Sequence, residues 1–178
     1  MLTGGPATTA LGICYDSGEK PLMEHLAIEQ LPFRLHSPAF AYGGMIPARH
    51  TCDGPNVNPP LSIANVPEDA EALALIMENA DSSGGAWTYW KLWNIDPHTT
   101  FIKENILPKG TIVGINSFGR PEYGGPCPGA GEHGYVFRLY ALRHSLHLPA
   151  EATDLMLRNA LLGNAIVETD LVGYYSRQ

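Results

Sequence analysis

The chain has few of the residues that mark several large classes of protein. Only 11 of its 178 residues are Lys or Arg, against 18 Asp or Glu, and its formal net charge is −7. The cations form no cluster, so we expect no nucleic-acid partner, because such partners require a positive surface. No apolar run approaches the roughly 20 residues that cross a bilayer, which predicts no integral membrane association.

Cysteine is also scarce. The three cysteines, Cys14, Cys52 and Cys127, are too few and odd in number for a disulfide framework. One bridge remains an alternative, but buried or partly buried free thiols in a reducing compartment are the favoured interpretation. The N-terminus has no basic segment followed by an apolar one, so it does not read as a secretory signal. The expected location is the cytoplasm.

Motifs for metal, cofactor and nucleophilic chemistry are missing as well. There is no Cys-x-x-Cys pair, no His-Glu-x-x-His motif, no Gly-x-Ser-x-Gly elbow and no phosphate-binding or dinucleotide loop. His144 and His147 lie three residues apart, but in a segment that we expect to form an exposed turn. We therefore expect no metal, no cofactor and no enzymatic activity.

The residues that are abundant favour an all-β domain. The chain has 19 Gly and 15 Pro, 44% hydrophobic residues and 16% charged ones, which indicates a globular protein with many turns. Residues 1–32 show no sustained periodicity and are predicted to be a weakly structured extension. Residues 33–178 are predicted to form one domain.

Short apolar segments predict the strands of this domain. Three Trp within residues 87–95 occupy both parities of a strand, which indicates a central strand packed on both faces. Residues 149–166 predict the one helix, with Leu155, Leu162 and Ile166 near one face. Residues 101–108 are predicted to be a connection. The other predicted strands cover residues 33–40, 73–77, 111–116, 135–142 and 167–175.

The most informative stretch runs from Ser117 to Arg143. Its first half is rich in Gly and Pro, and its second half turns abruptly into the aromatic and aliphatic composition of a buried strand. His133 lies at the junction. A rigid loop that delivers a histidine to the start of a core strand is a plausible way to hold a polar group at the mouth of a pocket.

Several motifs in this chain resemble one known family. They are Gly125-Pro126-Cys127-Pro128 with His133 and residues 135–142, the turn Cys52-Asp53-Gly54, the aromatic segment 87–95, and the closing Leu-Val-Gly-Tyr-Tyr-Ser-Arg at 171–177. Together they resemble the phosphatidylethanolamine-binding proteins, also known as Raf-kinase-inhibitor-like proteins, in their prokaryotic branch. The resemblance covers roughly residues 33–178. It implies a β-sandwich of two antiparallel sheets with Greek-key connections and a C-terminal helix.

The same resemblance implies a ligand pocket, with two departures from the family pattern. The family pocket is usually lined by two Asp and two His, and the matching positions here are Asn79, Asp81, Tyr89 and His133. A phenol at position 89 keeps a hydrogen-bonding group but loses the positive charge available to an imidazole at neutral pH. The predicted ligand-binding set comprises Asp53, Asn79, Asp81, Tyr89, Pro126, His133 and Tyr135.

By this resemblance the chain is a binding or inhibitory module for a small anionic or zwitterionic ligand such as a phospholipid head group. A protein kinase or protease target and a homodimer are implied by analogy. Two alternatives remain open. One is a hydrolase or other thiol-dependent enzyme that uses Cys127 and His133. The other is a degenerate pocket in a domain that acts through its surface, with Asp53 and Asp81 as turn residues and Tyr89 as core.

Overall fold

The computed structural model describes residues 31–80 and 87–177. These residues form nine strands, one α-helix and one short 3-10 helix. In chain order the elements are β1 (Arg34–His36), β2 (Gly44–Met45), η1 (Ala48–His50), β3 (Leu61–Ala64), β4 (Ala72–Asn79), β5 (Thr88–Ile95), β6 (Phe101–Ile102), β7 (Ile112–Val113), β8 (Glu132–Leu142), α1 (Asp154–Leu161) and β9 (Ala165–Ser176).

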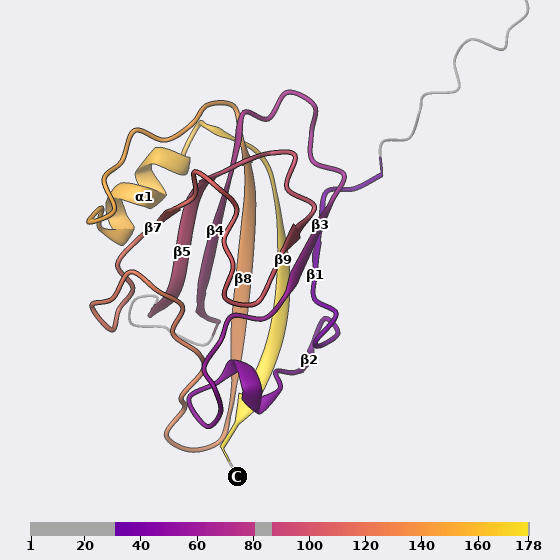
Figure 1. Ribbon diagram of the computed structural model, residues 1–178, viewed down its shortest axis with the longest axis vertical. Coiled ribbons are helices and arrows are strands. Elements are labelled where there is room, and N and C mark those ends of the chain that lie inside the picture. Colours follow the sequence, from indigo (N-terminus) through magenta and orange to yellow (C-terminus); the bar gives the residue numbers. More distant parts are fainter. Residues whose placement is uncertain (1–30, 81–86, 178) are drawn as a thin grey trace, which may run out of the picture. The chain divides into compact units, whose positions relative to one another are not determined.

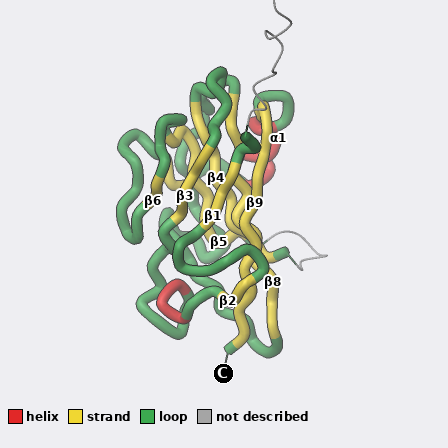
Figure 2. The backbone as a smooth tube through the Cα atoms, turned by 90° about the vertical axis from the view of Figure 1, so that its right-hand side faces the viewer, coloured by secondary structure: helices red, strands yellow, loops and turns green. Residues whose placement is uncertain are grey.

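The strands form two sheets, as the family resemblance implied (Figures 1 and 2). The smaller sheet has the order β1-β3-β6, and the larger has the order β2-β9-β8-β4-β5-β7. Within the larger sheet, β4, β5 and β7 are neighbours and β8 returns beside β4, which is the Greek-key order. The pairing of β2 with β9 is parallel, so the larger sheet departs from a purely antiparallel one at its edge.

Each face of the larger sheet buries its own apolar cluster. The face toward the smaller sheet carries the main core, with Leu75 and Met77 of β4 and Phe137 of β8 packed against Leu61 of β3. The opposite face packs against α1 through Leu157, and Figure 1 shows this helix beside the sheet. β4 is therefore buried on both faces, which explains its continuous apolar sequence.

Strand β5 contains only two of the three Trp, because Trp87 precedes the strand and is exposed, and the strand does not keep a simple alternation. Tyr89 and Trp90 both belong to the main core although they are adjacent, because the register with β4 shifts between Met77 and Glu78. A second shift lies near Asn94, whose φ is +56°. Bulges of this kind place two residues against one on the partner strand and re-aim the side chains that follow. The strand is buried on both faces and lies between β4 and β7, as predicted, but a strict alternation of faces does not hold along it.

The helix is shorter than predicted and presents a different face. It begins after Thr153, whose side chain accepts a hydrogen bond from the Met156 amide, and it ends before Gly163, whose φ is +75°. Leu157 and Leu161 are buried, whereas Leu155 and Leu162 are exposed. The prediction of a helix over residues 149–166, with Leu155, Leu162 and Ile166 near one apolar face, was therefore wrong at both ends and in its buried face. Its C-terminal end comes early because the residues from Ala165 onward pair with β8 as strand β9.

Other boundaries also differ from the prediction. The first strand covers only Arg34–His36, and the expected connection 101–108 contains β6. Residues 1–30 of the predicted N-terminal extension lie outside the described residues, so the division at residue 32 stays a prediction. Within the described part of the chain, no helix has the length and apolar character needed to span a membrane.

Candidate functional site

Three of the predicted site residues converge at one end of the larger sheet, where β4 ends and β5 and β8 begin (Figure 1). Asn79 is the last residue of β4 and stands opposite Tyr135 of β8 in the register. The ring of Tyr135 meets the ring of Tyr89, from β5, edge to face with 5.2 Å between the centroids. Strand pairing thus unites positions that are up to 56 residues apart in the sequence.

His133 lies two residues before Tyr135, so both side chains belong to the same face of β8. It is half-buried, in contrast to the fully buried Tyr135. Its Nε2 lies 3.1 Å from the carbonyl oxygen of Ala130, an acceptor to which the ring nitrogen donates. The imidazole is thus placed where the main core opens toward solvent.

Asp53 reaches this end of the sheet from the turn after η1. Its carboxylate accepts hydrogen bonds from the hydroxyl of Tyr175 at 2.7 Å and from Nε of Arg177 at 3.1 Å. The Tyr175 hydroxyl, helped by Arg177, lowers the pKa of the Asp53 carboxyl below its usual value. Tyr175 stands opposite His133 in the pairing of β8 with β9. Asp53 therefore connects to the site through a neighbour of His133.

The Gly- and Pro-rich connection before β8 forms a wall beside these residues. The amide of Gly124 donates to the carbonyl oxygen of Tyr89 at 3.0 Å. Pro126 is buried, and its carbonyl oxygen accepts from the Cys52 amide at 3.1 Å. A side chain at Gly125 would come within 2.5 Å of the His50 carbonyl oxygen, so glycine is needed for this close approach.

Further aromatic residues complete the wall, among them Tyr123, which the sequence suggested either as a wall of the cavity or as core. Phe118 lies edge-on to Tyr89, with ring centroids 5.8 Å apart, and also contacts Trp87. Tyr123 is buried and donates from its hydroxyl to the His50 carbonyl oxygen at 2.7 Å. Burial raises the pKa of both Tyr89 and Tyr123 above that of an ordinary phenol, so both stay neutral further into the alkaline range.

A cavity of about 270 Å³ is lined in part by residues of this wall, but by none of the predicted site residues that the structure describes. Asn116 and Asn56 supply amide groups to its lining, but both side chains already form hydrogen bonds within the protein. The Asn116 side chain donates to the carbonyl oxygens of Tyr89 and Glu122, and the Asn56 side chain accepts from the Gly125 amide. The lining of this cavity consists of Cys52, Asn56, Asn116, Phe118, Arg120, Glu122, Tyr123, Gly124, Gly125 and Cys127.

The cysteines at this site are joined, contrary to the interpretation as free thiols. Cys52 and Cys127 form a disulfide with their Cα atoms 5.4 Å apart. The pair is 75 residues apart in the sequence, and only the packing of the two loops brings it together. A disulfide sulfur carries no thiolate, so Cys127 is not a nucleophile in this state. The alternative of a thiol-dependent enzyme using Cys127 and His133 is therefore wrong for the oxidised protein.

Two further predictions concern Asp81 and metal binding. Asp81 lies outside the described residues, so its place in the site stays a prediction. Among the residues that the structure describes, no group of three or more His, Cys, Asp or Glu side chains is arranged to hold a metal ion.

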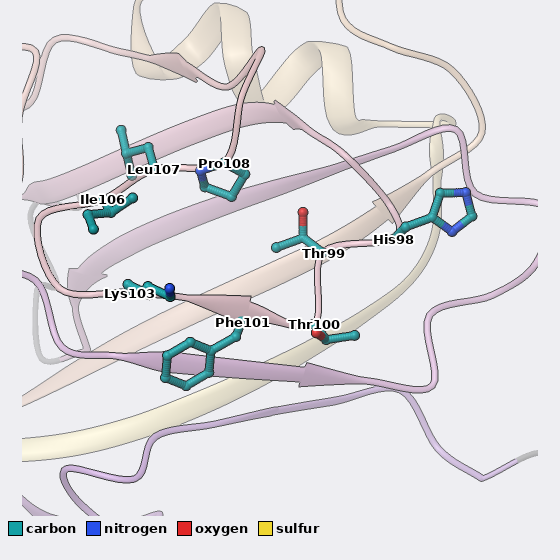
Figure 3. Close-up of a pocket in the computed structure, with 8 residues that line it drawn as sticks. All are labelled: His98, Thr99, Thr100, Phe101, Lys103, Ile106, Leu107 and Pro108. Atoms are coloured by element: carbon teal, nitrogen blue, oxygen red, sulfur yellow. The ribbon is translucent and has the colours of Figure 1, made fainter.

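Figure 3 shows a larger hollow, of about 370 Å³, in a different part of the molecule beside β6. Phe101 lies on one side of it and Ile106, Leu107 and Pro108 on the other, with His98 at one end. The remaining lining residues are Thr99, Thr100 and Lys103. None of the predicted site residues lines it, so this hollow is separate from the site at the start of β8.

Comparison with known proteins identifies the fold and the family. A model of the family "Phosphatidylethanolamine-binding protein" matches residues 36–176. A UPF0098 protein of Methanothermobacter thermautotrophicus is 43% identical over 148 residues, which cover 80% of this chain and 98% of the relative. A candidate lipoprotein of Mycobacterium tuberculosis, LppC, is 38% identical over 146 residues, covering 81% of this chain and 72% of LppC.

Two solved structures share the fold. Chlamydia trachomatis CT736, a candidate homologue of the phosphatidylethanolamine-binding proteins, has a TM-score of 0.78 and 33% identity, covering 82% of this chain and 98% of CT736. Escherichia coli YbcL, described as a new member of the mammalian family, has a TM-score of 0.76 and 25% identity, covering 82% of this chain and 99% of YbcL. The chain belongs to the phosphatidylethanolamine-binding protein family.

Proposed function

We propose that this protein is a binding module that holds a small anionic or zwitterionic group, such as a phospholipid head group, at the end of the larger sheet. The observation that supports this most is the convergence of Asn79, Tyr89 and Tyr135 from three neighbouring strands. His133 shares a face of β8 with Tyr135 and is half-buried beside them. Hydrogen-bonding groups beside packed aromatic rings are suited to orient one small ligand.

The chemistry of the described residues favours a compact head group over a polyanion. Tyr89 and Tyr135 bring neutral phenols, and Asn79 brings an amide. His133 brings an imidazole, the one basic side chain of this group. Because the whole chain carries a formal charge of −7, a ligand that also has an ammonium group suits it better than a dianion.

Asp53, Pro126 and Asp81 stay predictions as ligand contacts. We propose that Asp53 and Pro126 act by shaping the wall, because the Asp53 carboxylate is engaged by Tyr175 and the Pro126 carbonyl by Cys52. A kinase or protease target, a homodimer and a cytoplasmic location stay predictions from the sequence and the family resemblance.

An NMR titration of the full chain with phosphate, phosphoethanolamine and acetate tests the proposal. We expect saturable shifts of the His133 imidazole and the Tyr89 ring, with phosphoethanolamine binding more tightly than acetate. His133→Gln should weaken phosphoethanolamine binding several-fold. His144→Gln is the matched control, because His144 is exposed and pairs with Glu71 in another part of the structure.

Two outcomes would contradict the proposal. If His133→Gln binds phosphoethanolamine as the parent does, His133 is not part of the site. If no ligand shifts either ring in a folded sample, the packing of Tyr89 against Tyr135 and Phe118 has closed the pocket. The domain would then act through its surface, and protein partners should be sought.

A further inference from the structure

The disulfide connects two loops beside the proposed site: the turn after η1 and the connection between β7 and β8 that forms the wall. Cys52 lies in the turn that follows η1, next to Asp53. Cys127 lies in the long connection between β7 and β8, six residues before His133. The bond therefore joins segments that the sequence separates by 75 positions.

Hydrogen bonds join the same two loops around the disulfide. The Cys52 amide donates to the Pro126 carbonyl oxygen at 3.1 Å, and the Gly125 amide donates to Oδ1 of Asn56 at 2.7 Å. The Tyr123 hydroxyl donates to the His50 carbonyl oxygen at 2.7 Å. These contacts do not depend on the sulfur atoms, so cleavage of the disulfide should loosen the two loops without releasing them.

Both ends of the disulfide connect to residues of the proposed site. On the Cys127 side, the nearby Gly124 amide donates to the Tyr89 carbonyl oxygen, and the connection continues into His133. On the Cys52 side, Asp53 accepts from Tyr175, which stands opposite His133 in the sheet. If these loops become less ordered, the change is therefore transmitted to the Tyr89 and His133 rings, which would bind the ligand.

The disulfide is accessible to a reductant. Cys52 and Cys127 are exposed, although the segment from Tyr123 to Pro126, which directly precedes Cys127, is buried. Both cysteines also line the cavity of about 270 Å³. Exposed disulfides are more readily reduced than buried structural ones, and they are the ones that tend to be labile or regulatory.

We propose that the Cys52–Cys127 disulfide is a redox-reactive site at which a dithiol reductant loosens the wall of the ligand site and weakens ligand binding. A thiolate of the reductant attacks one sulfur, the S–S bond breaks, and the other cysteine leaves as a thiolate that takes up a proton. The second thiol of the reductant then displaces the mixed disulfide. Two electrons and two protons pass to Cys52 and Cys127, and the dithiol becomes a cyclic disulfide.

The first test measures the loops without any ligand. Amide hydrogen exchange is compared between the full chain as the disulfide and after reduction by dithiothreitol, with Cys14→Ser in both samples so that no third thiol exchanges. We expect at least several-fold faster exchange of the Cys52, Gly124 and Gly125 amides in the reduced form. The amides of β4 should be unchanged, because that strand is paired on both sides.

A double variant guards against incomplete reduction. Cys52→Ser with Cys127→Ser should reproduce the exchange pattern of the reduced protein in the absence of dithiothreitol. Unchanged exchange in the loops of both samples would overturn the proposal. Unfolding of the whole domain in both samples would overturn it too, since the disulfide would then be a structural staple and not a local control.

The second test concerns the ligand and rests on the proposed function. Phosphoethanolamine is titrated into the oxidised and the reduced chain, and we expect affinity lower by on the order of threefold to tenfold in the reduced form, because a looser wall must be ordered on binding. Equal affinity in the two forms would overturn the proposal that the disulfide controls ligand binding, and it would leave the proposed function standing. Absence of binding in the oxidised form would refute the proposed function, and hydrogen exchange would still decide whether reduction loosens the loops.

Discussion

Tyr89 of β5 and Tyr135 of β8 meet edge to face across the end of β4, with ring centroids 5.2 Å apart and planes at 83°. Both side chains are at most 7% exposed. This contact joins two strands that are not direct neighbours in the sheet. It makes the phenol at position 89 part of the core as well as of the proposed site.

Removal of the Tyr89 ring should therefore destabilise the domain. We expect Tyr89→Ala to lower the free energy of unfolding by about 3 kcal/mol, as for other large core side chains. Tyr89→Phe keeps the contacts with Tyr135 and Phe118 and should cost less than about 1.5 kcal/mol. Urea unfolding of the two variants measures the difference. Equal losses would show that the hydroxyl, and not the ring packing, provides the stability.

The glycines of the connection before β8 allow a sharper comparison. Gly125→Ala places a methyl group 2.5 Å from the His50 carbonyl oxygen, so the loop or the backbone of η1 must move. Gly129 has nothing within 4 Å of an added Cβ. We expect Gly125→Ala to cost about 1–3 kcal/mol of stability, the usual range for overpacking, and Gly129→Ala to cost much less. Similar denaturation midpoints for the two variants would contradict this reading of the loop.

A buried cation pairs with the start of α1. Lys91 is 2% exposed, and its Nζ lies 2.6 Å from Oδ1 of Asp154 and 3.0 Å from the Ala152 carbonyl oxygen. Asp154→Ala leaves this ammonium without its carboxylate, and breaking a buried pair costs about 3–5 kcal/mol. Because the Asp154 side chain is 36% exposed, the lower end of this range is expected.

Asp69→Ala is the matched control for that substitution. Asp69 pairs with Arg143 at 3.8 Å on an exposed surface, and such pairs contribute at most about 1 kcal/mol. Chemical denaturation of both variants at neutral pH tests the prediction. A loss for Asp154→Ala no larger than the loss for Asp69→Ala would mean that water or another group satisfies Lys91.

The carboxyl of Asp53 should make the free energy of unfolding depend on pH in the acid range. The Tyr175 hydroxyl and Arg177 lower its pKa in the folded protein below the ordinary value of 3.8. A depressed folded pKa contributes stability that is present above the unfolded pKa and is lost as the pH falls through the folded pKa. Asp53→Asn should therefore be less stable than the parent at neutral pH, and the difference should shrink below about pH 4.

Urea midpoints of the parent and Asp53→Asn from pH 7 down to about pH 2 measure this effect. Asp69→Asn serves as the control, because its exposed carboxylate has only the long contact to Arg143. A difference between the parent and Asp53→Asn that stays constant across the acid range would show that the hydrogen bonds act without the charge.

Much of the fold followed from the sequence because its causes are local. The apolar segment at 73–77 and the aromatic segment at 87–95 became β4 and β5, since each carries enough buried surface to specify a strand. The Gly- and Pro-rich half of residues 117–143 became an irregular connection, and its second half became β8. The family resemblance then pointed to Asn79, Tyr89, His133 and Tyr135 as parts of one site. Strand pairing brings Asn79, Tyr89 and Tyr135 together.

What the sequence left open depends on contacts between distant segments. The Cys52–Cys127 pair forms only because η1 and the β7–β8 connection pack together, and no spacing rule reveals a bridge over 75 residues. The bulges that turn Tyr89 and Trp90 to one face arise from the register with β4. The helix begins later than predicted, at the Thr153 cap, and ends earlier because residues after Gly163 pair with β8 instead. Local composition thus determined the strands and the turns, whereas tertiary packing decided the disulfide, the register and the wall beside Tyr89.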